Sequence, residues 1–167
     1  MLNNLIFINT TRFFLLILVQ VLILNQINLF GYINPYLYIL FIIIYPFTAN
    51  KSLLIFLSFL LGLFIDFFSD SGGIHAAASV FIAFIRPVIL KYSFGISYEY
   101  NTIKISSEDY LKQTIYVGSM VFLHHFIMFA LEIFNINNFL LFLNSILFSS
   151  IFSIVIILCT ITLFSKK

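Results

Sequence analysis

Charged residues are scarce in this sequence. Of its 167 residues, 62% are hydrophobic and only 8% are charged, and the mean hydropathy is +1.14. Because soluble globular domains carry about 25% charged residues, this composition predicts an integral membrane protein. The length suits a single domain over residues 1–167. The eight basic residues are scattered and form no basic patch interleaved with aromatic residues, so binding of nucleic acid is not expected.

Cysteine and catalytic motifs are scarce as well. Cys159 is the only cysteine, so neither a disulfide within the chain nor a metal site with several cysteine ligands is possible. The sequence has no phosphate-binding glycine loop and no Ser-x-x-Lys or Gly-x-Ser-x-Gly motif. It also shows no paired catalytic carboxylates. These absences argue against an enzyme, and they imply no cofactor and no metal ion.

Aliphatic and aromatic residues, by contrast, form long runs. A helix needs roughly 20 apolar residues to cross a bilayer core of about 30 Å, and six segments qualify. They cover residues 13–30, 33–48, 52–68, 74–92, 111–134 and 139–164, with a hydrophilic loop at 93–110. The second is the shortest, with Pro35 at its start and Pro46 in its last turn. The expected fold is therefore an all-α membrane protein with six transmembrane helices in one bundle.

Basic residues fall on alternate connections of this six-helix arrangement. Arg12 precedes the first helix and Lys51 lies between the second and third. The remaining lysines belong to the loop between the fourth and fifth helices or to the C-terminus: Lys91, Lys104, Lys112, Lys166 and Lys167. Because cytoplasmic loops carry an excess of Lys and Arg, both termini and the 93–110 loop are predicted to be cytoplasmic.

Small residues form stripes on the third and fourth predicted helices. Ser58, Gly62 and Asp66 are spaced four residues apart and therefore share one helix face. The next helix carries a similar stripe of Ala76, Ser79 and Ala83. Since lipid offers no hydrophobic drive between helices, small residues that permit close contact favour association. The two helices are predicted to pack as an antiparallel hairpin.

Polar residues gather at the corner of that hairpin. Asp66 is expected to meet the free N–H groups at the start of the fourth helix, whose partial positive charge stabilises a carboxylate. Gly72 and Gly73 supply positive φ angles for a tight reversal, and His75 is placed to donate to an acid. We interpret the corner as a carboxylate and a turn that lock the hairpin. An ion or proton site at Asp66 and His75 is the alternative.

Further ionisable residues lie within the predicted helices. Arg86 precedes Pro87, so it is expected either to snorkel to the inner interface or to bond a carbonyl that the proline leaves free. His124 and His125 point about 100° apart on a helix, so they are not expected to bind one metal ion. One is expected to bond inside the bundle and the other to face lipid or a partner. Together with Glu132 they form a possible partner-binding strip.

The segment GLFIDFFSDSGGIHAAASVFIAFIRP resembles the signature of the bacterial rod shape-determining protein MreD family. That signature is roughly Gly-Leu-x-x-Asp, a short turn, then Gly-x-His-Ala and a helix rich in small residues. The matching positions are Gly62, Leu63, Asp66, Gly73, His75 and Ala76. The match covers only residues 62–87 of the 167, and the rest is similar in length and in its number of apolar runs.

The resemblance implies a non-catalytic scaffold subunit in the inner membrane, part of the machinery that elongates bacterial cells. Proteins of this family act with MreC and the actin-like MreB, in a complex that engages RodA and a class B penicillin-binding protein to build lateral peptidoglycan. The implied fold is similar to that of the S components of energy-coupling-factor transporters. A vitamin-binding carrier subunit is therefore the alternative, although residues 13–30 lack the Ala-x-x-x-Ala docking motif of such subunits.

Overall fold

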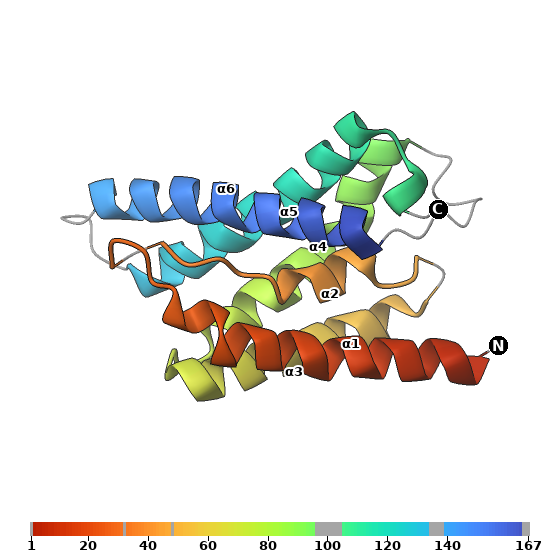
Figure 1. The fold of residues 1–167 in the computed structure, drawn as a ribbon, viewed down its shortest axis with the longest axis horizontal. Coiled ribbons are helices and arrows are strands. Elements are labelled where there is room, and N and C mark those ends of the chain that lie inside the picture. Colours follow the sequence, from red (N-terminus) through yellow and green to blue (C-terminus); the bar gives the residue numbers. More distant parts are fainter. Residues whose placement is uncertain (1, 32, 48, 96–104, 134–138, 165–167) are drawn as a thin grey trace.

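The computed structural model of the chain describes residues 2–31, 33–47, 49–95, 105–133 and 139–164. Its elements follow the order α1 (Leu2–Leu22), the 3₁₀ helix η1 (Leu24–Gln26), α2 (Ile39–Ile44), α3 (Lys51–Ser69), α4 (Ile74–Phe94), the 3₁₀ helix η3 (Ile105–Ser107), α5 (Tyr110–Glu132) and α6 (Phe139–Phe164). The helix α3 packs against α4, α4 against α5 and α5 against α6, while α1 packs against α3. Figure 1 shows the N-terminal end of α1 and the C-terminal end of α6 at the same end of this bundle.

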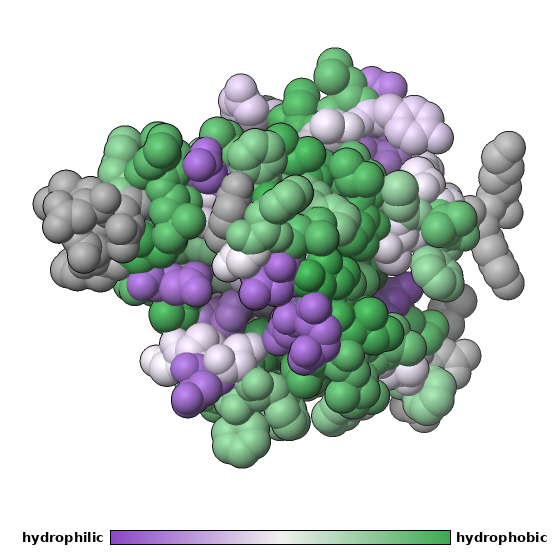
Figure 2. All heavy atoms as spheres, turned by 60° about the vertical axis from the view of Figure 1, so that its left-hand side comes forward, coloured by the Kyte–Doolittle hydropathy of each residue, from purple (hydrophilic) through white to green (hydrophobic). Residues whose placement is uncertain are grey.

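Five helices in the described part of the chain are long and apolar enough to cross a membrane. Figure 2 shows apolar side chains over much of the visible face. For the described residues, the structure thus confirms an all-α protein with several helices long and apolar enough to cross a membrane. The predicted segments from residue 52 onward match α3 to α6 within two residues wherever the structure describes them. Residue 134 and residues 96–104 of the predicted 93–110 loop lie outside the described residues.

The first predicted helix, at 13–30, is displaced along the chain. The helix α1 begins at Leu2 and ends at Leu22, so Arg12 lies inside it and does not precede it. Polar residues before position 13 favour a later start by sequence, but the helix continues through them, and the Thr11 hydroxyl donates to the Phe7 carbonyl oxygen. After η1 the chain reverses through residues with positive φ and a single bridge between residues 29 and 33.

The prediction of one continuous helix over 33–48 is wrong. Only Ile39–Ile44 is helical, and residues 34–36 before it have no regular structure. Proline contributes at both ends, because Pro35 lacks an N–H and Pro46 favours the extended conformation of Tyr45, which has φ −57° and ψ 140°. The segment still runs along the bundle between α1 and α6 (Figure 1). We call residues 33–47 the second pass.

The second pass supplies much of the core. Its most buried residues are at most 4% exposed: Tyr38, Ile39, Leu40, Phe41, Ile42 and Ile43. A helix that is apolar on every side is stable only when it is surrounded, so the long helices pack around α2. Large apolar residues on their outer faces, such as Phe67 and Phe84, stay exposed. In a membrane these outer faces meet lipid.

Candidate functional site

Asp66 caps the start of α4 from a neighbouring helix. Its carboxylate accepts from the backbone N–H groups of His75 (2.9 Å) and Ala76 (2.8 Å) and from the Ser71 hydroxyl (2.6 Å). The side chain is 4% exposed, so these bonds replace its hydration. The N-cap residue Gly73 provides no side-chain cap itself. The expected contact between Asp66 and the helix N-terminus is therefore present.

The backbones of α3 and α4 approach most closely beside this cap. A β-carbon on Gly62 would lie 2.5 Å from both the Ala76 nitrogen and the His75 carbonyl oxygen, so only glycine fits there. The turn that follows α3 uses positive φ at Gly72 (65°) and Gly73 (98°), as the sequence predicts. Four matched motif residues, Gly62, Asp66, His75 and Ala76, thus meet at one helix crossing, whereas the matched Leu63 is 44% exposed.

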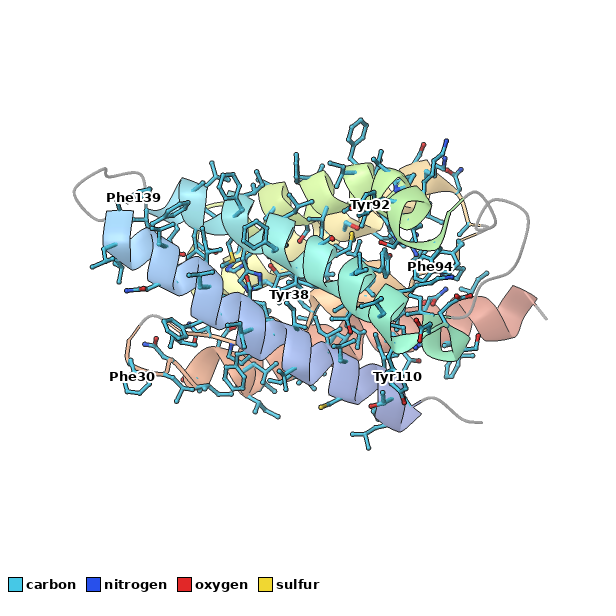
Figure 3. All side chains as sticks on the ribbon, turned by 90° about the horizontal axis from the view of Figure 1, so that it is seen from above. Phe30, Tyr38, Tyr92, Phe94, Tyr110 and Phe139 are labelled. Carbon is cyan, nitrogen blue, oxygen red and sulfur yellow. The ribbon has the colours of Figure 1, made fainter. Side chains whose placement is uncertain are left out.

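The imidazole ring of His75 contacts Tyr38, while the backbone N–H of the same residue donates to Asp66. Its Nδ1 lies 2.9 Å from the hydroxyl of Tyr38, and that hydroxyl lies 2.7 Å from Nε2 of His124. Figure 3 shows Tyr38 in the middle of the bundle, with long helices on either side. Because one hydroxyl donates only one proton, Tyr38 donates to one histidine and accepts from the other. We call Tyr38, His75 and His124 the histidine cluster.

His125 is also buried, so the prediction that one of the two adjacent histidines faces lipid or a partner is wrong. Both rings are fully buried. The Nδ1 of His125 lies 2.8 Å from the Val121 carbonyl oxygen, which assigns the ring proton to Nδ1. Its Nε2 then accepts from the Ser153 hydroxyl at 3.3 Å, and the oxygen of Ser153 accepts from the Tyr36 N–H at 2.9 Å. The neutral ring of His125 therefore has a hydrogen-bond partner at both of its nitrogen atoms.

Side chains of other helices also bond the non-helical backbone before α2. On α1, Gln20 accepts from the Leu37 N–H at 2.8 Å and donates to the Pro35 carbonyl oxygen at 3.0 Å. On α6, the Ser149 hydroxyl oxygen accepts from the Asn34 N–H at 3.3 Å. Ser149 and Ser153 of α6 therefore act as hydrogen-bond acceptors for this backbone. They replace helical hydrogen bonds that the second pass does not make.

Arg86 bonds the backbone of the second pass at the C-terminal end of α2. It donates to the carbonyl oxygens of Ile43 (3.3 Å) and Tyr45, and its Nε donates to the Tyr116 hydroxyl at 3.0 Å. The Tyr116 hydroxyl in turn donates to the Ile43 carbonyl. The guanidinium also lies 4.9 Å from the ring centre of Phe47. A cation at the C-terminus of a helix is favourable because the last carbonyls carry partial negative charge.

The two roles expected for Arg86 are both wrong. The side chain is 4% exposed and bonds to Ile43, Tyr45 and Tyr116 inside the bundle, so it does not snorkel to an interface. Neither does it bond a carbonyl left free by Pro87, which lies within α4. Glu132, the last residue of α5, is exposed, whereas His124 and His125 are buried, so the three do not form one surface strip. Of the expected partner-binding residues, only Glu132 is on the surface.

Among the described residues no three His, Cys, Asp or Glu side chains are grouped so that they could hold a metal ion. The Ser79 hydroxyl and Nδ1 of His124 are buried without a hydrogen-bond partner in that part of the chain. The other polar groups of the site bond to backbone or to one another. The arrangement holds the partly helical second pass in place among the longer helices.

Sequence reasoning missed the residues that organise this centre. Gln20, Tyr38 and Tyr116 were not expected to have a role. A glutamine within an apolar run such as that around Gln20 is the one local signal that was available, because a buried amide requires partners. Comparison of the chain with models of protein families, with curated proteins and with solved structures found no match.

Proposed function

We propose that the chain is a non-catalytic membrane scaffold of the MreD type, which binds MreC and thereby supports lateral peptidoglycan synthesis and rod shape. The observation that carries the proposal is the corner formed by Gly62, Asp66, Gly73, His75 and Ala76. The hydrogen bonds of Asp66 and His75, and the close backbone contact at Gly62, join α3, α4 and the second pass. A motif used in this way suits a scaffold, whose function is to present a fixed surface.

The proposal includes six crossings of the bacterial inner membrane, with the second pass as a partly extended crossing in an S-component-like fold. Charge supports the orientation. Lys51 starts α3 and Lys112 lies in the first turn of α5, whereas Asp70 follows α3 and Glu132 ends α5. At 1.5 Å per residue, Lys51 is separated from Asp70, and Lys112 from Glu132, by about 30 Å, the thickness of a bilayer core. The basic end is the cytoplasmic one under the positive-inside rule.

Co-purification tests this function directly. We expect MreC of the same organism to be recovered with the tagged chain from detergent after co-expression, together with MreB, RodA and the class B penicillin-binding protein where these are present. An unrelated protein with a single transmembrane helix serves as the control and is not expected to be recovered. Loss of MreC, alongside recovery of a vitamin or of an energising ATPase module, would show a carrier subunit instead.

A further inference from the structure

Arg12 is a charged residue inside a membrane-length helix. The apolar span that overlaps α1 runs from Ile6 to Gln26. Arg12 lies about 9 Å along the helix from the Ile6 end of this span, at 1.5 Å per residue. The Asn25 amide donates to the Ser69 hydroxyl and so places the C-terminal end of α1 beside that of α3. Arg12 therefore lies toward the end of the bundle where Lys51 begins α3.

The side chain of Arg12 has no partner within the described part of the chain. It makes no hydrogen bond or ion pair there, and it is exposed. Ile8 and Leu15, which lie one turn away on either side, are 45% and 53% exposed, so this side of α1 faces lipid. Arginine at membrane depth normally faces the bundle interior, as Arg86 does. Arg12 is thus an unsatisfied cation on the apolar surface.

Helix geometry directs this cation toward the membrane surface. Side chains on a helix lean toward its N-terminus, and the nearer end of the span from Arg12 is the N-terminal one. A long arginine side chain buries its apolar stem and carries its charge to the interface. Figure 1 shows α1 at the edge of the bundle, where lipid can approach it. The guanidinium therefore reaches the level of the lipid headgroups.

We propose that Arg12 binds the phosphate group of an anionic phospholipid beside α1. The planar guanidinium forms paired hydrogen bonds to phosphate oxygens, a geometry that lysine does not reproduce. Lys51 adds positive charge at the same end of the neighbouring helix. This site requires only that the chain lies in a membrane, so it is independent of the MreC proposal.

Native mass spectrometry with equal amounts of phosphatidylglycerol and phosphatidylcholine tests the site. The unmodified chain is expected to retain phosphatidylglycerol preferentially, and Arg12→Gln is expected to lower that retention about fivefold, the effect of one basic residue near a membrane surface. Arg12→Lys is expected to lose part of the preference. Lys91→Gln, which removes an exposed charge from the last turn of α4, is the matched control and is expected to change retention less.

Three outcomes would overturn the proposal. The first is equal retention of phosphatidylglycerol by Arg12→Gln and the unmodified chain, with unchanged melting temperatures. The second is that millimolar inorganic phosphate protects the chain against thermal unfolding as well as phosphatidylglycerol does, which would make a free anion the ligand. The third is efficient crosslinking from position 15 to a transmembrane segment of another protein in cells, which would assign Arg12 to a protein partner.

Discussion

The spacing of α3 and α4 depends on Gly62, whose side chain is a single hydrogen atom. Its missing β-carbon lets the backbone of α3 touch the backbone of α4 at Ala76. Close backbone contact matters in a membrane because van der Waals packing, and not the hydrophobic effect, holds helices together there. The same contact brings the carboxylate of Asp66 within reach of the start of α4.

Replacement of Gly62 is expected to separate the two helices. Gly62→Ala places a methyl group against rigid backbone, so α3 must move and the Asp66 cap must stretch. We expect a loss of about 1–3 kcal/mol in the free energy of unfolding, the usual cost of overpacking, seen as a lower melting temperature in detergent by circular dichroism.

Gly118 provides the matched control for this substitution. A β-carbon there would meet only the Ile154 side chain, at 3.9 Å, and Gly118 lies within α5. Gly118→Ala is expected to leave the melting temperature unchanged or to raise it, because alanine favours a helix. Equal melting temperatures for Gly62→Ala and the unmodified chain would contradict the close crossing.

The conformation of the second pass depends on hydrogen bonds from neighbouring helices. Backbone N–H and C=O groups at membrane depth require partners inside the protein, which makes a continuous helix the default. Here α1 supplies Gln20, α4 supplies Arg86, and α6 supplies Ser149 and Ser153 as those partners. The non-helical conformation is therefore possible only when the surrounding helices are in place.

The hydroxyl of Ser153 is expected to be essential to this element. Ser153→Ala removes the acceptor for the buried Tyr36 N–H and the donor to His125. Leaving a buried polar group unpaired costs about 1–3 kcal/mol, so the variant is expected to melt at a lower temperature.

Ser150→Ala makes the same chemical change on the same helix. The Ser150 hydroxyl is buried without a hydrogen-bond partner among the described residues, so its removal is expected to be neutral or slightly stabilising. If both variants destabilise equally, the α6 serines act through packing alone, and the hydrogen-bonding role of Ser153 is refuted.

At the scale of the whole molecule, charge distinguishes the two ends of the bundle. Lys51, Lys91 and Lys112 are exposed at one end, whereas Asp70 and Glu132 are exposed at the other. The tyrosines Tyr92 and Tyr110, at the basic end, are 83% and 73% exposed. Aromatic residues of this kind favour membrane interfaces, and their position at the basic end is what the proposed orientation predicts.

Cysteine labelling in spheroplasts tests the orientation that this asymmetry predicts. With Cys159→Ser as background, a membrane-impermeant maleimide is expected to label Gln26→Cys, because residue 26 lies at the end opposite the lysines. Tyr110→Cys is expected to react only after permeabilisation. The reverse pattern would place the basic end outside the cell and contradict the predicted cytoplasmic termini.

Much of this architecture follows from local sequence signals. Long apolar runs predict α3, α4, α5 and α6 almost to the residue, and the spacing of Ser58, Gly62 and Asp66 predicts their shared buried face. The glycine turn and the capped start of α4 are also local, because they involve neighbours along the chain. Short-range geometry and the hydrophobic length of a bilayer are sufficient for all of these features.

The second pass and the histidine cluster were decided only by tertiary structure. An apolar stretch such as residues 37–45 is compatible with a helix, and the flanking Pro35 and Pro46 alone do not say which backbone groups find other partners. Those partners come from Gln20, Arg86 and Ser153, which are distant in sequence. Likewise Tyr38 meets His75 and His124 only once three segments have packed together. By itself the sequence determined a membrane protein and its long helices. Long-range hydrogen bonds, whose cost when unmade is highest away from water, decided how its core is built.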